Sequence, residues 1–326
     1  MRDTILFGDC RKTLGTLHAQ ITTGIAERPR MCVTSPPYYG LRDYGGEESQ
    51  IGLEQSPEEY IEQMVEVMSL VRNCLTDDGT LWLNIGDSYN NYRPGKAYVK
   101  QTVASNNQDL PEHSPKRSNR LEGLKEKDLI GIPWMLAFAL RADGWYLRQD
   151  IIWHKPNPMP ESVRDRCTKS HEYIFLLSKN RKYFYDNEAI KEPAKDWGTR
   201  DRTNGKYHNE GTGLQPHSGL TKSYEKKNKR SVWTVNKKPY KGAHFATYPP
   251  ELIEPCIIAG SEKGDIILDP FMGSGTTAAV AKSLGRGYIG CELHEDYGNL
   301  IQKRVSEYKP VSEVAQEPPI SILDIV

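Results

Sequence analysis

The chain has 326 residues, enough for one large or two small domains and for a substantial core that needs no disulfide bonds. Its six cysteines include no CxxC pair, and no apolar run approaches the roughly 18 residues that span a bilayer, which argues against a zinc site, a secreted disulfide framework and a membrane protein. Lys and Arg equal Asp and Glu at 43 each, so the formal net charge of zero gives no sign of a nucleic-acid partner.

Short apolar runs alternate with amphipathic stretches along the chain. The sequence predicts strands at 4–9 (with a turn at Gly-Asp), 31–34, 80–87, 145–155, 171–179, 264–271 and 287–293, and the composition of 182–186 suggests one more. It predicts helices at 56–75, 132–144, 251–260 and 276–285. Ser56, Pro57 and Glu59 give the first helix its start, a capping box with proline at the first helical position. This alternation indicates an α/β fold with a doubly wound, mostly parallel sheet.

Two polar segments interrupt the pattern, and both are basic. Residues 93–127 carry 8 Lys or Arg and 4 Asp or Glu, and residues 191–241 carry 13 and 5, a local excess of +8. Basic segments with interleaved tyrosines suit a phosphate backbone. Two solvated loops would have the same composition, so charge leaves both interpretations open.

The stretch ILDPFMGSGTT (267–277) runs from a buried strand through a glycine turn into a helix. Gly273 and Gly275 permit tight backbone geometry and the close approach of a ligand. Glu292 ends the next strand, 17 residues after Gly275, which suits a carboxylate that binds ribose hydroxyls. The pattern is neither GxGxxG nor GxxxxGK, so a dinucleotide and an NTPase are not indicated. The pattern is compatible with a site for a small adenosyl ligand. It is also compatible with an ordinary tight turn that binds nothing.

The stretch VTSPPY (33–38) follows another predicted strand. Proline has a fixed φ and no N–H, so the elbow is rigid and offers acceptors rather than donors. A carbonyl and the Ser35 hydroxyl can accept hydrogen bonds from an NH₂ group, and Tyr38 can stack on a planar ring. These features suit the exocyclic amine of a nucleobase, which must be flipped out of duplex DNA to be reached. Taken alone, the stretch is more typical of a rigid proline turn.

Together and in this order, the two motifs resemble those of S-adenosylmethionine-dependent DNA amino-methyltransferases. The family pattern is (S/N/D)PP(Y/F/W) for the catalytic motif and DPFxGSGTT for the cofactor motif, and a catalytic motif that comes first resembles the β class. The resemblance runs from about Asp3 to Arg304. It implies a Rossmann-like methyltransferase sheet with an inserted basic target-recognition region. The implied division is a catalytic first part at 1–186 with a mobile loop at 90–127, a target-recognition region at 187–241, the cofactor half at 242–308 and a tail at 309–326.

The resemblance also assigns site residues, and no metal. Ser35, Pro36, Pro37 and Tyr38 are the implied catalytic residues. The implied cofactor-binding residues are Asp9, Cys10, Thr34, His244, Phe245, Ala246, Thr247, Asp269, Pro270, Phe271, Gly273, Ser274, Gly275, Thr276, Thr277 and Glu292. The implied base-pocket or DNA contacts are Tyr39, Arg42, Asp87, Trp153, Lys155 and Asn157. For Asp87, a base contact and a turn cap remain alternatives.

The target base is a separate question. Within the family, threonine before serine, as in TSPPY, favours cytosine-N4 enzymes, and adenine-N6 is the alternative. Other interpretations keep the fold but make RNA or a protein glutamine the acceptor, or leave a nucleic-acid-binding protein without activity. The implied partner is double-stranded DNA, and the resemblance allows a homodimer and a cognate restriction endonuclease. We expect the protein in the cytoplasm of a prokaryotic or phage-infected cell. The recognition sequence does not follow from the residues.

Overall fold

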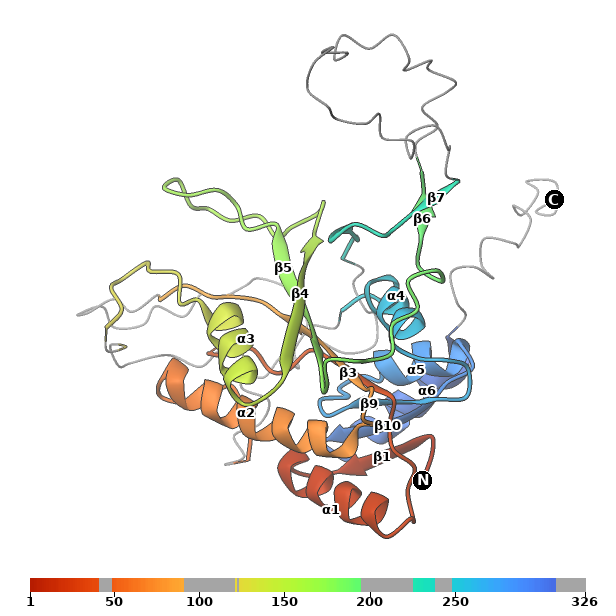
Figure 1. Ribbon diagram of the computed structural model, residues 1–326. Coiled ribbons are helices and arrows are strands. Elements are labelled where there is room, and N and C mark those ends of the chain that lie inside the picture. The colour runs from red at the N-terminus through yellow and green to blue at the C-terminus, as the bar shows by residue number, and fades with distance from the viewer. Residues whose placement is uncertain (41–48, 91–120, 122, 195–224, 238–247, 309–326) are drawn as a thin grey trace, which may run out of the picture.

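The computed structural model describes residues 1–40, 49–90, 121, 123–194, 225–237 and 248–308. Its largest element is an eight-stranded sheet with the order β1-β10-β9-β2-β3-β5-β4-β8 (Figure 1). The strands are β1 (Thr4–Phe7), β2 (Met31–Thr34), β3 (Thr80–Ile85), β4 (Tyr146–His154), β5 (His171–Ser178), β8 (Val232–Thr234), β9 (Ile266–Asp269) and β10 (Gly287–Glu292). The seven strands predicted outright all lie in this sheet.

The sheet is parallel except for one strand. Neighbours from β1 to β3 pair in parallel, β5 runs antiparallel to both β3 and β4, and β8 is parallel to β4. The predicted mostly parallel sheet is therefore confirmed. Because β1, β10, β9, β2 and β3 share one direction, their carboxyl ends meet at one edge, where α/β proteins bind ligands.

Helices cover both faces of the sheet, as a doubly wound fold requires. They are α1 (Cys10–Thr22), α2 (Pro57–Cys74), α3 (Ile132–Ala142), α4 (Pro250–Gly260), α5 (Thr276–Ser283) and α6 (Tyr297–Glu307). Figure 1 shows α2 and α3 on one side of the sheet and α4 and α5 on the other. Side chains alternate accordingly: Leu81 and Leu83 of β3 join the core under α1, α2 and α3, whereas Trp82 joins the core under α4, α5 and α6.

Helix α2 begins as the sequence predicts. The Ser56 hydroxyl accepts a hydrogen bond from the Glu59 N–H at 3.2 Å, and Pro57 is the first helical residue. The Glu59 carboxylate accepts from the Gln55 N–H at 3.1 Å, one residue before the cap that a standard capping box would satisfy. The helix therefore has both of its predicted N-terminal stabilising groups, in a slightly shifted arrangement.

Three local predictions differ from the structure. Helices α1 and α6 were not predicted, since α1 is rich in threonine and contains a glycine, and α6 buries only Ile301. The further strand suggested at 182–186 is wrong. There the Phe184 N–H donates to the Asp78 carbonyl, and the Tyr185 ring stacks on Trp82 at 6.2 Å. Tertiary contacts hold this aromatic segment in place without strand pairing.

The basic segment at 187–241 is described only in part. Strands β6 (Glu192–Pro193) and β7 (Lys226–Lys227) form a small antiparallel pair, and β8 adds the last strand to the main sheet. The mobile loop predicted at 90–127 falls mostly outside the described residues, as does the tail at 309–326. The proposed domain boundaries stay predictions. Among the described residues, no helix is long and apolar enough to cross a membrane.

Candidate active site

Asp269 lies at the centre of the edge where the strands end. It ends β9, is 1% exposed, and its two oxygens accept hydrogen bonds from three segments of the chain. Thr34 at the end of β2 donates at 2.6 Å, Tyr248 ahead of α4 donates at 3.1 Å, and Thr277 of α5 donates as well. Burial raises the pKa of Asp269, and the hydrogen bonds counter that rise in part. The hydrogen bond between Thr34 and Asp269 thus joins the end of β2 to the predicted cofactor turn.

The glycine turn after β9 has the geometry that the sequence predicts. Gly273 and Gly275 have φ values of +53° and +83°, in the left-handed region. A Cβ at Gly275 would lie 2.9 Å from Ile301 Cγ2, so α6 packs directly against this backbone. Ser274 is buried and accepts a hydrogen bond from Arg304 of the same helix. Helix α6, which the sequence did not reveal, therefore supports the turn.

Glu292 ends β10 beside this turn. Its carboxylate accepts from the Gly273 N–H at 2.8 Å and from the His294 N–H at 3.1 Å. Glu292 is 7% exposed, and burial raises its pKa to about 7. The side chain is thus a pre-positioned acidic group at the edge of the sheet, as its spacing from Gly275 predicts.

Asp9 lies at the next strand end, because the Gly8 N–H donates to the Glu292 carbonyl at 2.8 Å. Asp9 caps α1 through the Arg11 N–H and forms an ion pair with the Arg11 side chain at 2.8 Å. Burial alone would raise the pKa of Asp9, but the hydrogen bonds and charge of Arg11 lower it. Burial raises the pKa of the neighbouring Cys10 thiol to about 12, which keeps the thiol protonated.

These residues fit an adenosyl ligand. A Cβ at Gly273 would meet only the Phe271 carbonyl oxygen, at 3.9 Å, among the described atoms within 4 Å, so the turn leaves room for close approach. The Thr276 hydroxyl is buried and has no hydrogen-bond partner within the described part of the chain. The open backbone at Gly273, the Thr276 hydroxyl and the buried Glu292 carboxyl together provide the space and the polar groups that such a ligand needs. The predicted cofactor residues His244, Phe245, Ala246 and Thr247 lie outside the described residues.

The proline elbow follows β2 and is anchored from α2. The Tyr60 hydroxyl donates to the Pro37 carbonyl at 2.9 Å, and the Tyr60 ring packs on Tyr39 with centroids 5.5 Å apart. Tyr39 is 2% exposed, so it supports the elbow from within the core. Pro36 is buried, whereas Ser35 and Tyr38 are partly exposed. The elbow is therefore fixed from behind and presents its hydroxyl groups at the edge of the sheet.

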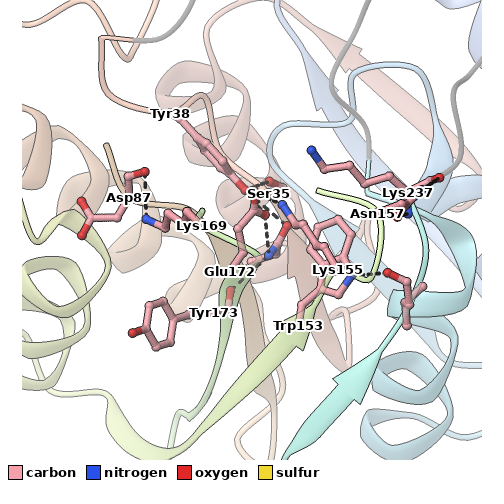
Figure 2. A network of polar contacts seen from close by, with 12 residues as sticks. Ser35, Tyr38, Asp87, Trp153, Lys155, Asn157, Lys169, Glu172, Tyr173 and Lys237 are labelled. Atoms are coloured by element: carbon pink, nitrogen blue, oxygen red, sulfur yellow. Dashed lines mark hydrogen bonds and ion pairs between the residues drawn. The ribbon is translucent and has the colours of Figure 1, made fainter. Parts of the chain in front are cut away.

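Ser35 and Tyr38 join a polar network that the sequence analysis did not find (Figure 2). The Ser35 hydroxyl lies 3.4 Å from the Tyr38 hydroxyl, which in turn donates to Glu172 Oε2 at 2.9 Å. Asn84 Oδ1 is 3.4 Å from the Tyr38 hydroxyl, and Lys155 forms an ion pair with the other Glu172 oxygen. Asn84 and Glu172 were missed, although each is a polar residue that interrupts or begins an otherwise apolar strand.

The predicted base-pocket residues are only partly brought together. Lys155 lies 4.1 Å above the ring centroid of Trp153, whose N–H donates to the Val235 carbonyl at 2.9 Å. Asn157 exchanges hydrogen bonds with the backbone of Lys237, at 3.1 and 3.0 Å. Both contacts tie β4 and the chain after it to the segment around β8 (Figure 2). Arg42 lies outside the described residues.

Asp87 has the geometry of a cap. Its carboxylate accepts hydrogen bonds from the N–H groups of Gly131 and Ile132, at 3.0 and 3.1 Å, which are the first N–H groups of α3. Lys169 donates to the backbone carbonyl of Asp87 at 3.0 Å (Figure 2). Of the two alternatives that the sequence left open, the described contacts match the cap.

Comparison with known proteins agrees with this geometry. Residues 30–303 match the N6/N4 methyltransferase family model, described as DNA methylase. The type II methyltransferase M.SmaI of Serratia marcescens is 46% identical over 301 residues, 92% of this chain and 90% of that protein. The type II methyltransferase M.XycI of Xanthomonas campestris pv. cyanopsidis is 48% identical over 276 residues, 85% of this chain and 81% of that protein.

Solved structures share the fold. The PvuII DNA methyltransferase (cytosine-N4-specific) superposes with a TM-score of 0.59 at 15% identity, covering 96% of this chain and 90% of that one. The M1.HpyAVI–SAM complex has a TM-score of 0.52 at 17% identity, covering 93% and 98%. The chain therefore belongs to the N6/N4 family of DNA methylases, and it is a DNA methyltransferase with S-adenosylmethionine as its cofactor.

Proposed function

We propose that the protein methylates the exocyclic amine of a base flipped out of double-stranded DNA, at a specific site, and that this base is cytosine, modified at N4. One observation carries the proposal: Ser35 and the proline elbow follow β2 directly, and the Thr34–Asp269 hydrogen bond holds them beside the glycine turn. The Thr-Ser pair before Pro-Pro-Tyr favours cytosine over adenine. The excess of positive charge at 191–241 supports a DNA partner.

The residues of the elbow have distinct roles in this proposal. The Ser35 hydroxyl and the Pro36 carbonyl accept hydrogen bonds from the two N–H groups of the amine, which turns the nitrogen lone pair out of conjugation with the ring. After methyl transfer the amine carries one proton too many, and this proton is released to solvent. The Tyr38 ring stacks on the base. S-adenosylmethionine, held by residues such as Gly273 and Glu292, supplies a methyl group on a positively charged sulfur. Orientation and exclusion of water then account for most of the acceleration, without a covalent enzyme intermediate.

Two partners stay predictions. The type II relatives suggest a cognate restriction endonuclease for this chain, and the family resemblance suggests a homodimer.

The identity of the methylated nucleoside tests the base. DNA from several sources is incubated with the protein and S-adenosylmethionine, digested, and analysed by mass spectrometry. N4-methylcytosine is the expected product. N6-methyladenine would overturn the choice of base but keep the elbow and the cofactor. If neither methylated nucleoside is formed, the proposal that DNA is the substrate is overturned.

Substitution of Ser35 tests the elbow. We expect Ser35→Ala to lower kcat by about 10²–10³-fold, because it removes a preorganised acceptor from the reacting amine. The affinity for S-adenosylmethionine, measured by calorimetry, should change little, since Ser35 lies outside the glycine turn. Ser306→Ala, on the exposed face of α6, is the matched control. An unchanged kcat in Ser35→Ala would remove Ser35 from the mechanism.

A further inference from the structure

With a serine at the first position of the elbow, the direction of its hydroxyl hydrogen bond is not fixed by the residue type. A hydroxyl group can donate or accept, whereas a carboxylate can only accept. If Ser35 is to accept a hydrogen bond from the target amine, its own proton must point elsewhere. In the structure the Ser35 hydroxyl has such a direction, toward the Tyr38 hydroxyl at 3.4 Å.

The Tyr38 hydroxyl is itself directed. It has one proton, and its nearest acceptor is Glu172 Oε2 at 2.9 Å, closer than Asn84 Oδ1 at 3.4 Å. A bond to an ionised carboxylate is also the stronger of the two. Burial, followed by the charge of Glu172, raises the pKa of Tyr38, so the phenol keeps its proton and remains a donor. The lone pairs of the Tyr38 hydroxyl oxygen are then left to accept a hydrogen bond from the Ser35 hydroxyl.

Glu172 is held for this task from several sides. Lys155, which is 6% exposed, pairs with Oε1, while Oε2 accepts from the Tyr38 hydroxyl at 2.9 Å and, at 3.5 Å, from the Asn84 amide. Asn84 donates to the Tyr173 carbonyl at 3.1 Å, which fixes its amide beside the same carboxylate. A Cβ at Gly86 would lie 2.8 Å from Tyr38 Cε2 and 3.2 Å from Glu172 Cγ, so only glycine permits this close arrangement. Figure 2 shows Ser35 and Tyr38 of the elbow, Glu172 of β5 and Lys155 after β4 converging.

We propose that Glu172 is a positioning residue for methyl transfer: through the Tyr38 hydroxyl it directs the Ser35 proton away from the target amine, so that Ser35 presents only lone pairs to it. This inference rests on the proposed role of Ser35 as an acceptor. The family pattern admits phenylalanine or tryptophan in place of Tyr38, so the relay is a property of chains that carry tyrosine there. In this chain, serine with Tyr38 and Glu172 does what a carboxylate does alone.

A purely structural role for Glu172 makes a different prediction. If the ion pair with Lys155 only closed the β4–β5 hairpin, its loss would lower stability and would be independent of the Tyr38 hydroxyl. If Glu172 acts through Tyr38, its effect on kcat must vanish once that hydroxyl is gone. A double-mutant cycle separates the two cases.

The experiment compares the full-length wild type with Glu172→Gln, Tyr38→Phe and the double variant. Transfer of labelled methyl groups to DNA gives kcat and KM, and calorimetry gives the affinity for S-adenosylmethionine. We expect each single variant to lower kcat by about tenfold, the effect of exchanging a charge-assisted hydrogen bond for a neutral or absent one. The double variant should be no slower than the slower single variant, with KM for DNA and cofactor affinity within about twofold of wild type.

Multiplied effects in the double variant would overturn the inference, as would a change confined to KM. Tyr38→Phe leaves the Lys155–Glu172 pair intact, so it remains informative if Glu172→Gln folds poorly.

Glu262→Gln is the matched control, because Glu262 is exposed and lies ahead of β9, at the opposite edge of the sheet. Because total methyl transfer is counted, N6-methyladenine as product would overturn the choice of base alone. A wild type that transfers no methyl group to DNA would overturn the proposed function itself.

Discussion

Burial raises the pKa of Glu292 from 4.5 to about 7. This shift affects the stability of the protein and its affinity for the cofactor in opposite directions as the pH changes. Between these values the folded protein holds a proton that the unfolded chain does not, so this group's contribution to stability falls as pH rises through that window. Ribose hydroxyls, in contrast, donate to the ionised carboxylate. Binding the cofactor should therefore be favoured as pH rises through 7.

We accordingly expect the affinity for S-adenosylmethionine to increase between pH 5 and 8, by up to about tenfold per unit below pH 7. Over the same range the ligand-free protein should lose the part of its stability that Glu292 provides. Calorimetry and thermal unfolding measure the two quantities. Glu292→Gln should flatten the pH dependence of binding, and Glu295→Gln, an exposed neighbour, should not. An equal slope in Glu292→Gln would contradict this assignment.

Some residues of the candidate site lie in short sequence motifs, whereas others are brought to the site only by the fold. The positions of Ser35, Gly273 and Glu292 at strand ends could be predicted, because each lies in a motif that follows or ends a strand. Glu172 could not, because its contact with Tyr38 exists only after β5 inserts antiparallel beside β3, and strand order is not a local property. Tyr248 was given no role of its own, and its hydrogen bond to Asp269, 21 positions further along the chain, appears only in the structure.

At the scale of elements, α3 depends on a residue from another strand end. Its first N–H groups, at Gly131 and Ile132, are satisfied by Asp87, which follows β3. Gly131 has no side chain to cap the helix itself. The loss of such a cap usually destabilises a protein by about 0.5–2 kcal/mol.

We therefore expect Asp87→Ala to lower the free energy of unfolding by about 1–2 kcal/mol in urea titrations, with kcat nearly unchanged. Asp87→Asn keeps one acceptor oxygen and should be milder. A large loss of kcat at normal stability would instead favour the base contact that the sequence left open.

The turn between β9 and α5 offers a second comparison. Gly273 and Gly275 both have positive φ, but only at Gly275 would a Cβ meet α6, 2.9 Å from Ile301 Cγ2. Gly273→Ala should lower stability by about 1 kcal/mol through backbone strain alone. Gly275→Ala adds steric overlap and should cost about 2–4 kcal/mol. Thermal unfolding of the two variants tests this order, and equal losses would mean that α6 can shift.

Elements differ in how far they can be predicted. Helix α2 has a cap, a proline start and an apolar stripe, and all three agree with the structure. Helix α6 lacks a side-chain cap and buries only Ile301, so its formation depends on packing against Gly275. The aromatic residues at 182–186 look like a strand because their rings are covered, but they are covered by Trp82 and Arg30 rather than by strand neighbours.

For the molecule as a whole, net charge is a poor guide to its partner. The chain is neutral overall, yet 191–241 has an excess of +8. If that segment contacts phosphates, then Lys226→Gln with Lys229→Gln should weaken binding to DNA and reduce the slope of log K against log salt by about 2. Lys303→Gln on α6 is the control. Filter binding over a range of salt concentrations measures the slope, and an unchanged slope would place these lysines away from DNA.

The pairing of β2 with β9 also affects how the protein is made. Cys32 lies opposite Leu268 in the sheet, and Thr34 binds Asp269 across 235 positions of sequence. At a synthesis rate of about 5–20 residues per second, β2 leaves the ribosome roughly 10–50 seconds before its partner exists. During that interval one edge of β2 has unpaired backbone groups that other chains, or a chaperone, can occupy. A nascent chain therefore cannot complete the Thr34–Asp269 contact until translation has passed β9, and the exposed edge of β2 persists until then.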